Sequence, residues 1–288
     1  MITDAILVIV GLFALLAASI SDIKKREVPD WISYSLIFTG FALRFMHSFV
    51  YQEWNYFYYG LLGFAITFII GNLMFRARQW GGGDTKLVMG VGIVFATRPS
   101  FLQAHDIPFL VMMLVNILFI GAIYGIIYSI VLAIKNWKKF KPVAAKMNKD
   151  KRVIVIKIKA FIFAVSTIMI TTMTQIDTEL KLISSLIAFL LVIYPYLTVL
   201  IKAVEKSALY KMLPAKDLTP GDWVEQDVYK NGKIIYKQNP LGIEQGDINK
   251  LIKAKVAKVL VKEGIPFIPP FFIAALITVL VGKLLFVV

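Results

Sequence analysis

The sequence contains no cysteine and only two histidines, His47 and His105, among its 288 residues. The absence of cysteine excludes disulfides, thiol catalysis and cysteine-based zinc sites. With so few histidines a histidine-rich metal site is not expected, and we expect no cofactor. Any chemistry of this chain therefore has to come from other side chains.

Charged residues are also scarce. The chain is 58% hydrophobic, whereas soluble domains are roughly 45–50% hydrophobic. The apolar residues form long runs, at 5–20, 31–50, 57–75, 87–97, 107–134, 153–174, 182–201 and 265–288. Most runs approach the roughly 20 residues that a helix needs to cross about 30 Å of hydrocarbon. We expect an α-helical polytopic membrane protein with about eight transmembrane helices, six or seven being possible.

The net charge of +14 does not indicate a nucleic-acid partner, because the positive residues are unevenly distributed. Of the 32 Lys and Arg residues, 28 lie in four segments, 23–30, 76–86, 135–159 and 202–264. Cytoplasmic loops carry this excess of Lys and Arg in membrane proteins. The pattern predicts a cell-membrane protein with its N-terminus outside and these four segments in the cytoplasm, in contact with membrane lipids.

One soluble segment interrupts the apolar runs. The stretch DWVEQDVYKNGKIIYKQ alternates like two strands around Asn231-Gly232, a strong hairpin signal, and a short helix and another strand follow it. We therefore predict a transmembrane core at 1–201, a cytoplasmic α+β module at 202–264 and a C-terminal transmembrane helix at 265–288.

The lysine-rich connector at 135–152 has two interpretations. It is either an anchor that fixes the topology, which we favour, or a contact for anionic lipids. Arg44 and His47 lie three residues apart near the end of a predicted span, and we expect them to reach toward the outer interface.

The segment QWGGGDTKLVMG places Gly81, Gly82, Gly83 and Asp84 between two apolar runs. Asp84 alone could be a helix N-cap, but a cap does not explain three preceding glycines. Glycine is used where φ is positive or where another backbone approaches closely. A phosphate-binding loop is a competing interpretation, but Lys86 follows Gly83 too closely for the lysine of such a loop. We favour a polar cleft with a carboxylate at its edge, which at membrane depth indicates function.

A second acid, Asp22, ends the first run in ASISDIKKREVPDW, and alone it is as consistent with an interfacial cap as with a catalyst. The predicted topology brings Asp22 and Asp84 to the same membrane face. Two close carboxylates share a proton, so one can act as general base and the other as general acid. This pair is the only credible catalytic set in the sequence.

The residues GGGD at 81–84 match the GxGD signature of membrane aspartyl proteases. SDIKKREVPDW resembles the region of the first catalytic aspartate in type IV prepilin peptidases, and the chain is similar to the archaeal prepilin and preflagellin peptidases over roughly residues 1–135. The resemblance implies an aspartic-type endopeptidase with Asp22 and Asp84 as catalytic residues. It also implies cleavage of class III leader peptides from pilin-like or preflagellin precursors at the cytoplasmic face. Nothing in the sequence indicates the oligomeric state.

Three alternatives remain open. Presenilin-like and signal-peptide-peptidase-like proteases share GxGD, but Ser21 stands where they carry tyrosine before the first aspartate. A proton-coupled transporter would favour acids near the bilayer midplane and repeated spans. A non-enzymatic scaffold leaves the glycines and acids unexplained. Within the peptidase interpretation, Glu27 and Asp30 are the local acids that could receive the positive charge of a basic leader.

Overall fold

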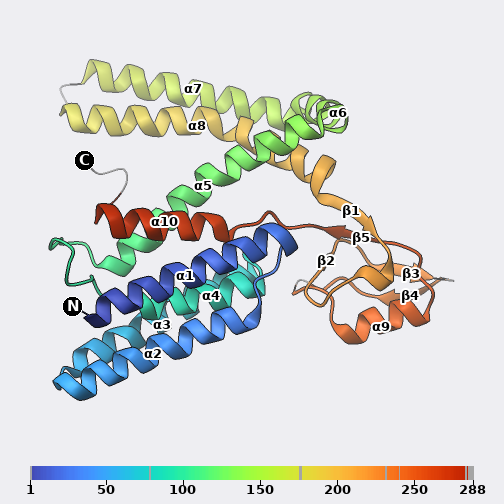
Figure 1. Ribbon diagram of the computed structural model, residues 1–288. Helices are drawn as coiled ribbons and strands as arrows, with labels where there is room; N and C mark the ends of the chain where they lie inside the picture. The colour runs from blue at the N-terminus through green and yellow to red at the C-terminus, as the bar shows by residue number, and fades with distance from the viewer. Residues whose placement is uncertain are drawn as a thin grey trace. The chain divides into compact units, whose positions relative to one another are not determined.

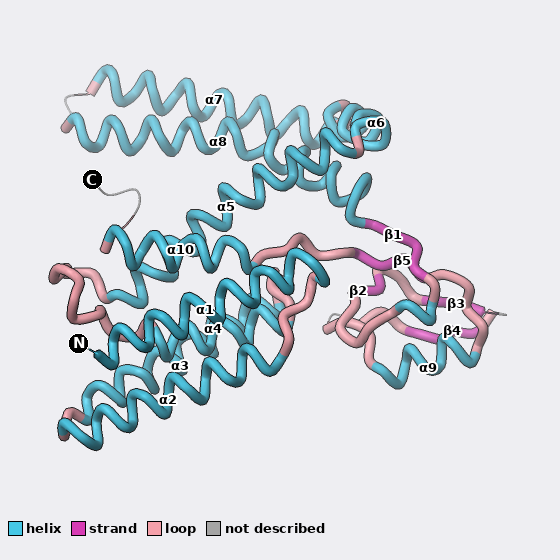
Figure 2. The backbone as a smooth tube through the Cα atoms, viewed as in Figure 1, coloured by secondary structure: helices cyan, strands magenta, loops and turns pink. Residues whose placement is uncertain are grey.

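The computed structural model describes residues 2–77, 79–174, 177–230, 232–239, 241–282 and 284 of the chain. It is mostly helical, with a small sheet region (Figures 1 and 2). The chain divides into two compact units, of which unit 1 comprises Met1–Gly125 and Met212–Val288 and unit 2 comprises Ile126–Lys211. Each unit is described separately below.

Five helices of the described residues are long and apolar enough to cross a membrane. They are α1 (Ile2–Lys25), α3 (Trp54–Arg76), α5 (Phe109–Lys135), α7 (Lys151–Met173) and the segment Thr178–Leu209, which joins α8 (Thr178–Val204) to the π-helical η1 (Glu205–Leu209). This number supports the predicted membrane protein without fixing the predicted total of eight spans.

Three further helices occupy the remaining predicted runs, namely α2 (Asp30–Tyr51), α4 (Gly82–Val94) and α10 (Ile268–Val281). The 13 residues of α4 and the 14 residues of α10 span about 20 Å at 1.5 Å per residue, which is less than the hydrocarbon thickness. Part of the last predicted run, at residues 283 and 285–288, lies outside the described residues.

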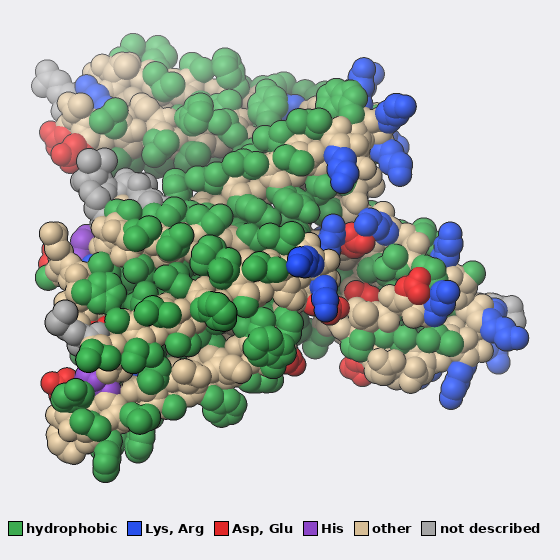
Figure 3. Space-filling model, viewed as in Figure 1, with side chains coloured by type: hydrophobic (Ala, Val, Ile, Leu, Met, Phe, Trp, Pro, Cys, Tyr) green, Lys and Arg blue, Asp and Glu red, His purple; other side chains and the backbone are tan. Residues whose placement is uncertain are grey.

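In unit 1, α4 packs against α1, α2 and α3 and is the most buried of these helices. Small residues allow the close approach: a Cβ atom on Gly63 of α3 would collide with the backbone carbonyl of Gly92 on α4. Small residues at such contacts are typical of membrane helix packing. Figure 3 shows hydrophobic side chains covering the visible helices of this unit, with Lys, Arg, Asp and Glu gathered over its sheet region.

The expectation that Arg44 reaches toward the outer interface is wrong. Its side chain is fully buried, and its guanidinium donates to the carbonyls of Ile93 (2.7 Å), Val94 (3.2 Å) and Tyr56 (2.9 Å) and to the hydroxyl of Thr97. The last carbonyls of a helix have no partner inside it, and a cation there also interacts favourably with the helix dipole. Arg44 therefore caps the C-terminal end of α4.

Among its described residues, the sheet region contains five short strands and one helix. They are β1 (Tyr210–Leu213), β2 (Trp223–Val224), β3 (Val228–Lys230), β4 (Lys233–Tyr236), α9 (Gln245–Lys253) and β5 (Val259–Lys262), with a 3₁₀ turn at Ala215–Asp217. One sheet has the order β1-β5-β2, and β3 and β4 form a separate antiparallel hairpin. Its core contains Val224, Tyr236, Ile243, Leu251 and Val261.

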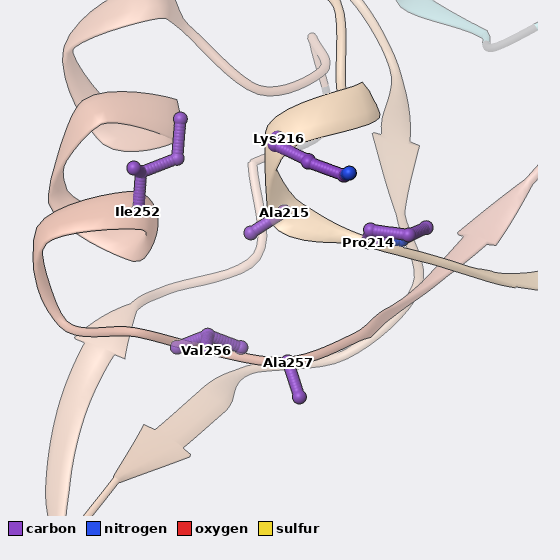
Figure 4. A pocket seen from close by; sticks show the side chains of 6 residues that line it. All are labelled: Pro214, Ala215, Lys216, Ile252, Val256 and Ala257. Carbon is purple, nitrogen blue, oxygen red and sulfur yellow. The ribbon is translucent and has the colours of Figure 1, made fainter.

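The hairpin, the short helix and the following strand were all predicted from the sequence, and all three are confirmed. Lys230 pairs with Lys233, and Gly232 has a φ of +75°, which glycine adopts readily. Asn231, the other residue of the predicted turn, lies outside the described residues. A shallow depression in the same region is lined by Pro214, Ala215, Lys216, Ile252, Val256 and Ala257 (Figure 4).

Unit 2 consists of the end of α5, a helix α6 (Trp137–Asn148), the neighbouring helices α7 and α8, and η1. The lysine-rich connector predicted at 135–152 is thus mostly helical. The small apolar core of unit 2 contains Ala133, Phe140, Ala203 and Val204.

Candidate active site

Asp22 lies one turn before the end of α1 and is only 5% exposed. Its Oδ2 atom accepts a hydrogen bond from the backbone N–H of Ile268, at 2.9 Å. Ile268 is the first residue of α10, where backbone N–H groups have no partner inside the helix and the dipole favours a negative charge. The N-terminus of α10 therefore holds the carboxylate of Asp22.

Asp84 lies in the first turn of α4 and is partly buried. Its Oδ2 atom accepts a hydrogen bond from the backbone N–H of Gly81 at 3.0 Å, and the hydroxyl of Thr85 donates to the carbonyl of Gly81 at 3.0 Å. A carboxylate at this position reaches back to the residue before the helix and stabilises its start. Asp84 thus has a capping contact, and its second oxygen has no hydrogen bond to another described residue.

The structure brings the two acids together. Asp22 on α1 and Asp84 on α4 are 62 positions apart in the sequence, yet α1 contacts α4 and the two carboxylates are close enough to interact electrostatically. The start of α10 lies beside Asp22 in the same unit, so that three helix ends meet at the pair.

Of the three glycines, Gly83 is the one at which the surrounding structure leaves no room for a larger side chain. A Cβ atom at Gly83 would lie 2.9 Å from the Cβ of Val28 and 3.1 Å from its carbonyl oxygen. The segment that links α1 to α2 therefore passes directly over the turn that begins α4. Neither Gly81 nor Gly82 is crowded in this way, and none of the three has a positive φ. The backbone that approaches the glycines is the chain's own.

The two acids expected to receive a basic leader lie near the pair, but both contact residues of this chain. Asp30 forms an ion pair with Lys86 of α4 at 2.7 Å. Glu27 accepts a hydrogen bond from the hydroxyl of Thr219 in the sheet region, at 3.3 Å.

Sequence reasoning missed the residues between β5 and α10. Besides the contact of Ile268 with Asp22, Arg26 forms an ion pair with Glu263 and donates to the carbonyl of Gly264. A signal for this region exists in the prolines Pro269 and Pro270, which mark the first turn of a helix and hence free N–H groups. Nothing in the sequence indicates that these groups face Asp22, 246 positions earlier.

Comparison with known proteins finds a family match in the N-terminal part of the chain. Residues 9–130, which contain both acids and the glycines, match the model of the type IV leader peptidase family. The resemblance expected from the motifs is confirmed there. The match covers less than half of the chain, and it includes neither the sheet region nor α10.

The curated relatives come from archaea. The preflagellin peptidase of Methanocaldococcus jannaschii is 39% identical over 84 residues, which are 29% of this chain and 36% of that protein. The preflagellin peptidase of Methanococcus voltae is 33% identical over 132 residues, 44% of this chain and 56% of that protein. The prepilin peptidase EppA of Methanothermobacter thermautotrophicus is 28% identical over 103 residues, 36% of this chain and 27% of that protein.

The chain thus spans between about a quarter and just over half of the length of these relatives. No solved structure matches the chain.

Proposed function

We propose that this protein is a membrane aspartic endopeptidase that removes the leader peptide from pilin-like or archaeal flagellin precursors. The observation that carries the proposal is the juxtaposition of Asp22 and Asp84, which come from two different helices of the part that matches the leader peptidase family. Two carboxylates that lie close enough to influence each other electrostatically are suited to hydrolysis of a peptide bond, because they can divide the roles of acid and base.

In the proposed reaction the ionised aspartate takes a proton from a water molecule, whose oxygen attacks the carbonyl carbon of the scissile peptide. The protonated aspartate donates to the carbonyl oxygen, which stabilises the negative charge that develops there. The protonated aspartate then gives its proton to the nitrogen, a hydroxyl group of the tetrahedral intermediate returns its proton to the other aspartate, and the C–N bond breaks to release the amine and the new carboxyl group. The pair is left with one proton, as at the start.

The site is proposed to face the cytoplasm. Lys24, Lys25 and Arg26 follow Asp22 directly, and basic segments mark the cytoplasmic side. With eight spans, the N-terminus and the C-terminus are both outside. Residues 1–201 and 265–288 then form the membrane part, and the module at 202–264 lies in the cytoplasm.

The names of the relatives support the class of substrate, since preflagellin and prepilin peptidases are named for flagellin and pilin precursors. Among the acids near the pair, Glu27 is the better candidate to receive a basic leader, because Asp30 already forms an ion pair with Lys86. Reversing the charge at Glu27 should raise the KM for a lysine-bearing leader. An unchanged KM would remove Glu27 from the binding surface.

The experiment that tests the function is a cleavage assay. The purified full chain in detergent is incubated with a pilin-like precursor, and the product is analysed by mass spectrometry. The proposal predicts a single shortened product whose new N-terminus lies just before the hydrophobic segment. If the folded peptidase leaves the precursor intact, or cuts it within the hydrophobic segment, the proposed function is wrong.

A further inference from the structure

The helix α6 of unit 2 has two distinct faces. One face is apolar and packs on the end of α8 and on η1. Its residues Phe140, Val143, Ala144 and Met147 belong to the same cluster as Leu200, Ala203, Val204 and Ala208. These contacts fix the rotation of α6 about its own axis, and they determine which side chains point away from the unit.

The rest of the α6 surface carries positive charge. Lys138, Lys139, Lys141 and Lys146 are exposed, and among the described residues none of the four pairs with an acid. Figure 3 shows Lys and Arg side chains gathered at the end of unit 2 where Figure 1 labels α6. The only acid in 135–159 is Asp150, whose carboxylate accepts from the backbone N–H of Arg152 at 2.8 Å and caps the start of α7. No acid within 135–159 therefore offsets the positive charge of the face.

The neighbours of α6 in the sequence set its place relative to a bilayer. It connects α5 and α7, both of which are long and apolar enough to cross a membrane. Its 12 residues extend about 18 Å, too little to cross about 30 Å of hydrocarbon. A short helix that connects two such spans is expected to lie at a membrane surface.

An aromatic residue at the start of α6 fits that position. Trp137 is 53% exposed, and its ring stacks on Phe140 with 5.8 Å between the ring centroids. Tryptophan is enriched at the level of the lipid head groups, where its ring is half in apolar surroundings and its N–H is hydrated.

We propose that the lysine face of α6, defined as Lys138, Lys139, Lys141 and Lys146, binds the anionic head groups of the lipid bilayer in which the protein sits. Complementary charge selects this partner. The flanking spans hold the face at the head-group level, where each lysine strengthens the attraction to an anionic surface by about fivefold. The inference does not depend on peptidase activity.

The test uses the full chain in a neutral detergent and measures the thermal unfolding temperature with added lipid. Three additions are compared: phosphatidylglycerol, phosphatidylcholine and inorganic phosphate. A ligand that binds the native state raises this temperature. We expect phosphatidylglycerol to raise it by at least about 3 °C more than phosphatidylcholine, and inorganic phosphate to have no comparable effect.

The variant replaces all four lysines of the face with glutamine. The matched control makes the same change at four exposed lysines of the sheet region, Lys233, Lys237, Lys253 and Lys258. Both variants lose four positive charges. The lysine-face variant should lose the preference for phosphatidylglycerol and keep its response to phosphatidylcholine, while the control keeps both.

Three outcomes would overturn the proposal. They are a wild-type protein without a preference for phosphatidylglycerol, a lysine-face variant that keeps it, and a control that loses it equally. An effect of inorganic phosphate as large as that of the lipid would show a free-anion site instead. All eight lysines are exposed, so both variants should fold. The unfolding temperature with phosphatidylcholine alone checks this.

Discussion

The carboxylate of Asp22 accepts a hydrogen bond from the backbone N–H of Ile268, 2.9 Å away and 246 positions later in the chain. The first proposed catalytic acid is therefore held by the helix that follows the sheet region. The segment between β5 and α10 also contacts Arg26 through Glu263 and Gly264. The sheet region and the proposed catalytic pair are mechanically connected at this point.

Exchanging the charges of Arg26 and Glu263 tests this connection. Arg26→Glu should lower kcat by at least about threefold, because it repels Glu263 and displaces the segment that holds Asp22. Glu263→Arg should act similarly, and the double exchange should restore most of the rate.

Lys25→Glu is the matched control, since it makes the same change at the preceding exposed residue. If the control loses as much activity as Arg26→Glu, or the double exchange is no better than the single variants, the connection does not position Asp22. Comparison of kcat with KM distinguishes displacement of Asp22 from weaker attraction of a charged substrate.

A methyl group at Gly83 should disturb the site. Gly83→Ala places a Cβ within 3.1 Å of the backbone of Val28, so the segment that follows Asp22 has to move. Overpacking of this kind costs about 1–3 kcal/mol, and we expect lower thermal stability together with reduced cleavage.

The same substitution at the neighbouring position, Gly82→Ala, is the matched control. Its Cβ would meet only the ring of Phe75, at the ordinary contact distance of 3.9 Å, and alanine favours a helix over glycine. Gly82→Ala should therefore be as stable as the wild type or slightly more so. Equal damage from both substitutions would mean that the approach of Val28 is not what requires glycine.

Removal of the buried guanidinium should destabilise the helix that carries Asp84. Arg44→Met keeps much of the side-chain volume but leaves the carbonyls of Ile93 and Val94 without their donors. Unsatisfied buried groups cost about 1–3 kcal/mol each, so the unfolding temperature should fall by several degrees. A wild-type unfolding temperature in this variant would show that the cap of α4 is dispensable.

The sequence predicted the features that depend on local pattern. Run lengths indicated membrane helices, and Asn231-Gly232 indicated the hairpin. The cost of an acid near the hydrocarbon singled out Asp84, and the predicted topology added Asp22; their catalytic role stays a prediction. The environment of Arg44 was misjudged, because a charge near a helix end is consistent with either reaching outward or capping a neighbouring helix. Only the packing of α2 against α4 decides between the two.

Contacts distant in sequence were beyond local reasoning. The prolines after Phe267 indicate a helix start with free N–H groups, but not that Asp22 accepts from them. The three glycines were expected to line a polar cleft that admits another backbone. Val28 of the chain itself approaches Gly83 alone, and the cleft stays a prediction.

Cross-linking tests the proximity of the two acids without any substrate. Because the chain has no cysteine, Asp22→Cys with Asp84→Cys creates a pair without background thiols. A short flexible bis-thiol reagent should join the two positions within one chain, and mass spectrometry of the digested protein identifies the joined peptides. The pair Asp22→Cys with Asp106→Cys should not be joined, since the proposed topology puts Asp106 on the opposite side of the membrane. Joining of the control pair alone would contradict both the topology and the pairing.

The most direct measurement is the cleavage rate of a pilin-like precursor by Asp22→Asn and Asp84→Asn, compared with Asp106→Asn. Asparagine keeps the shape of the side chain and a carbonyl to accept from Ile268 or Gly81, but it cannot exchange the proton. Both site variants should retain the wild-type unfolding temperature and lose at least about 1,000-fold in kcat, whereas Asp106→Asn should cleave normally. If either site variant cleaves at more than a few hundredths of the wild-type rate, Asp22 and Asp84 are not the catalytic pair.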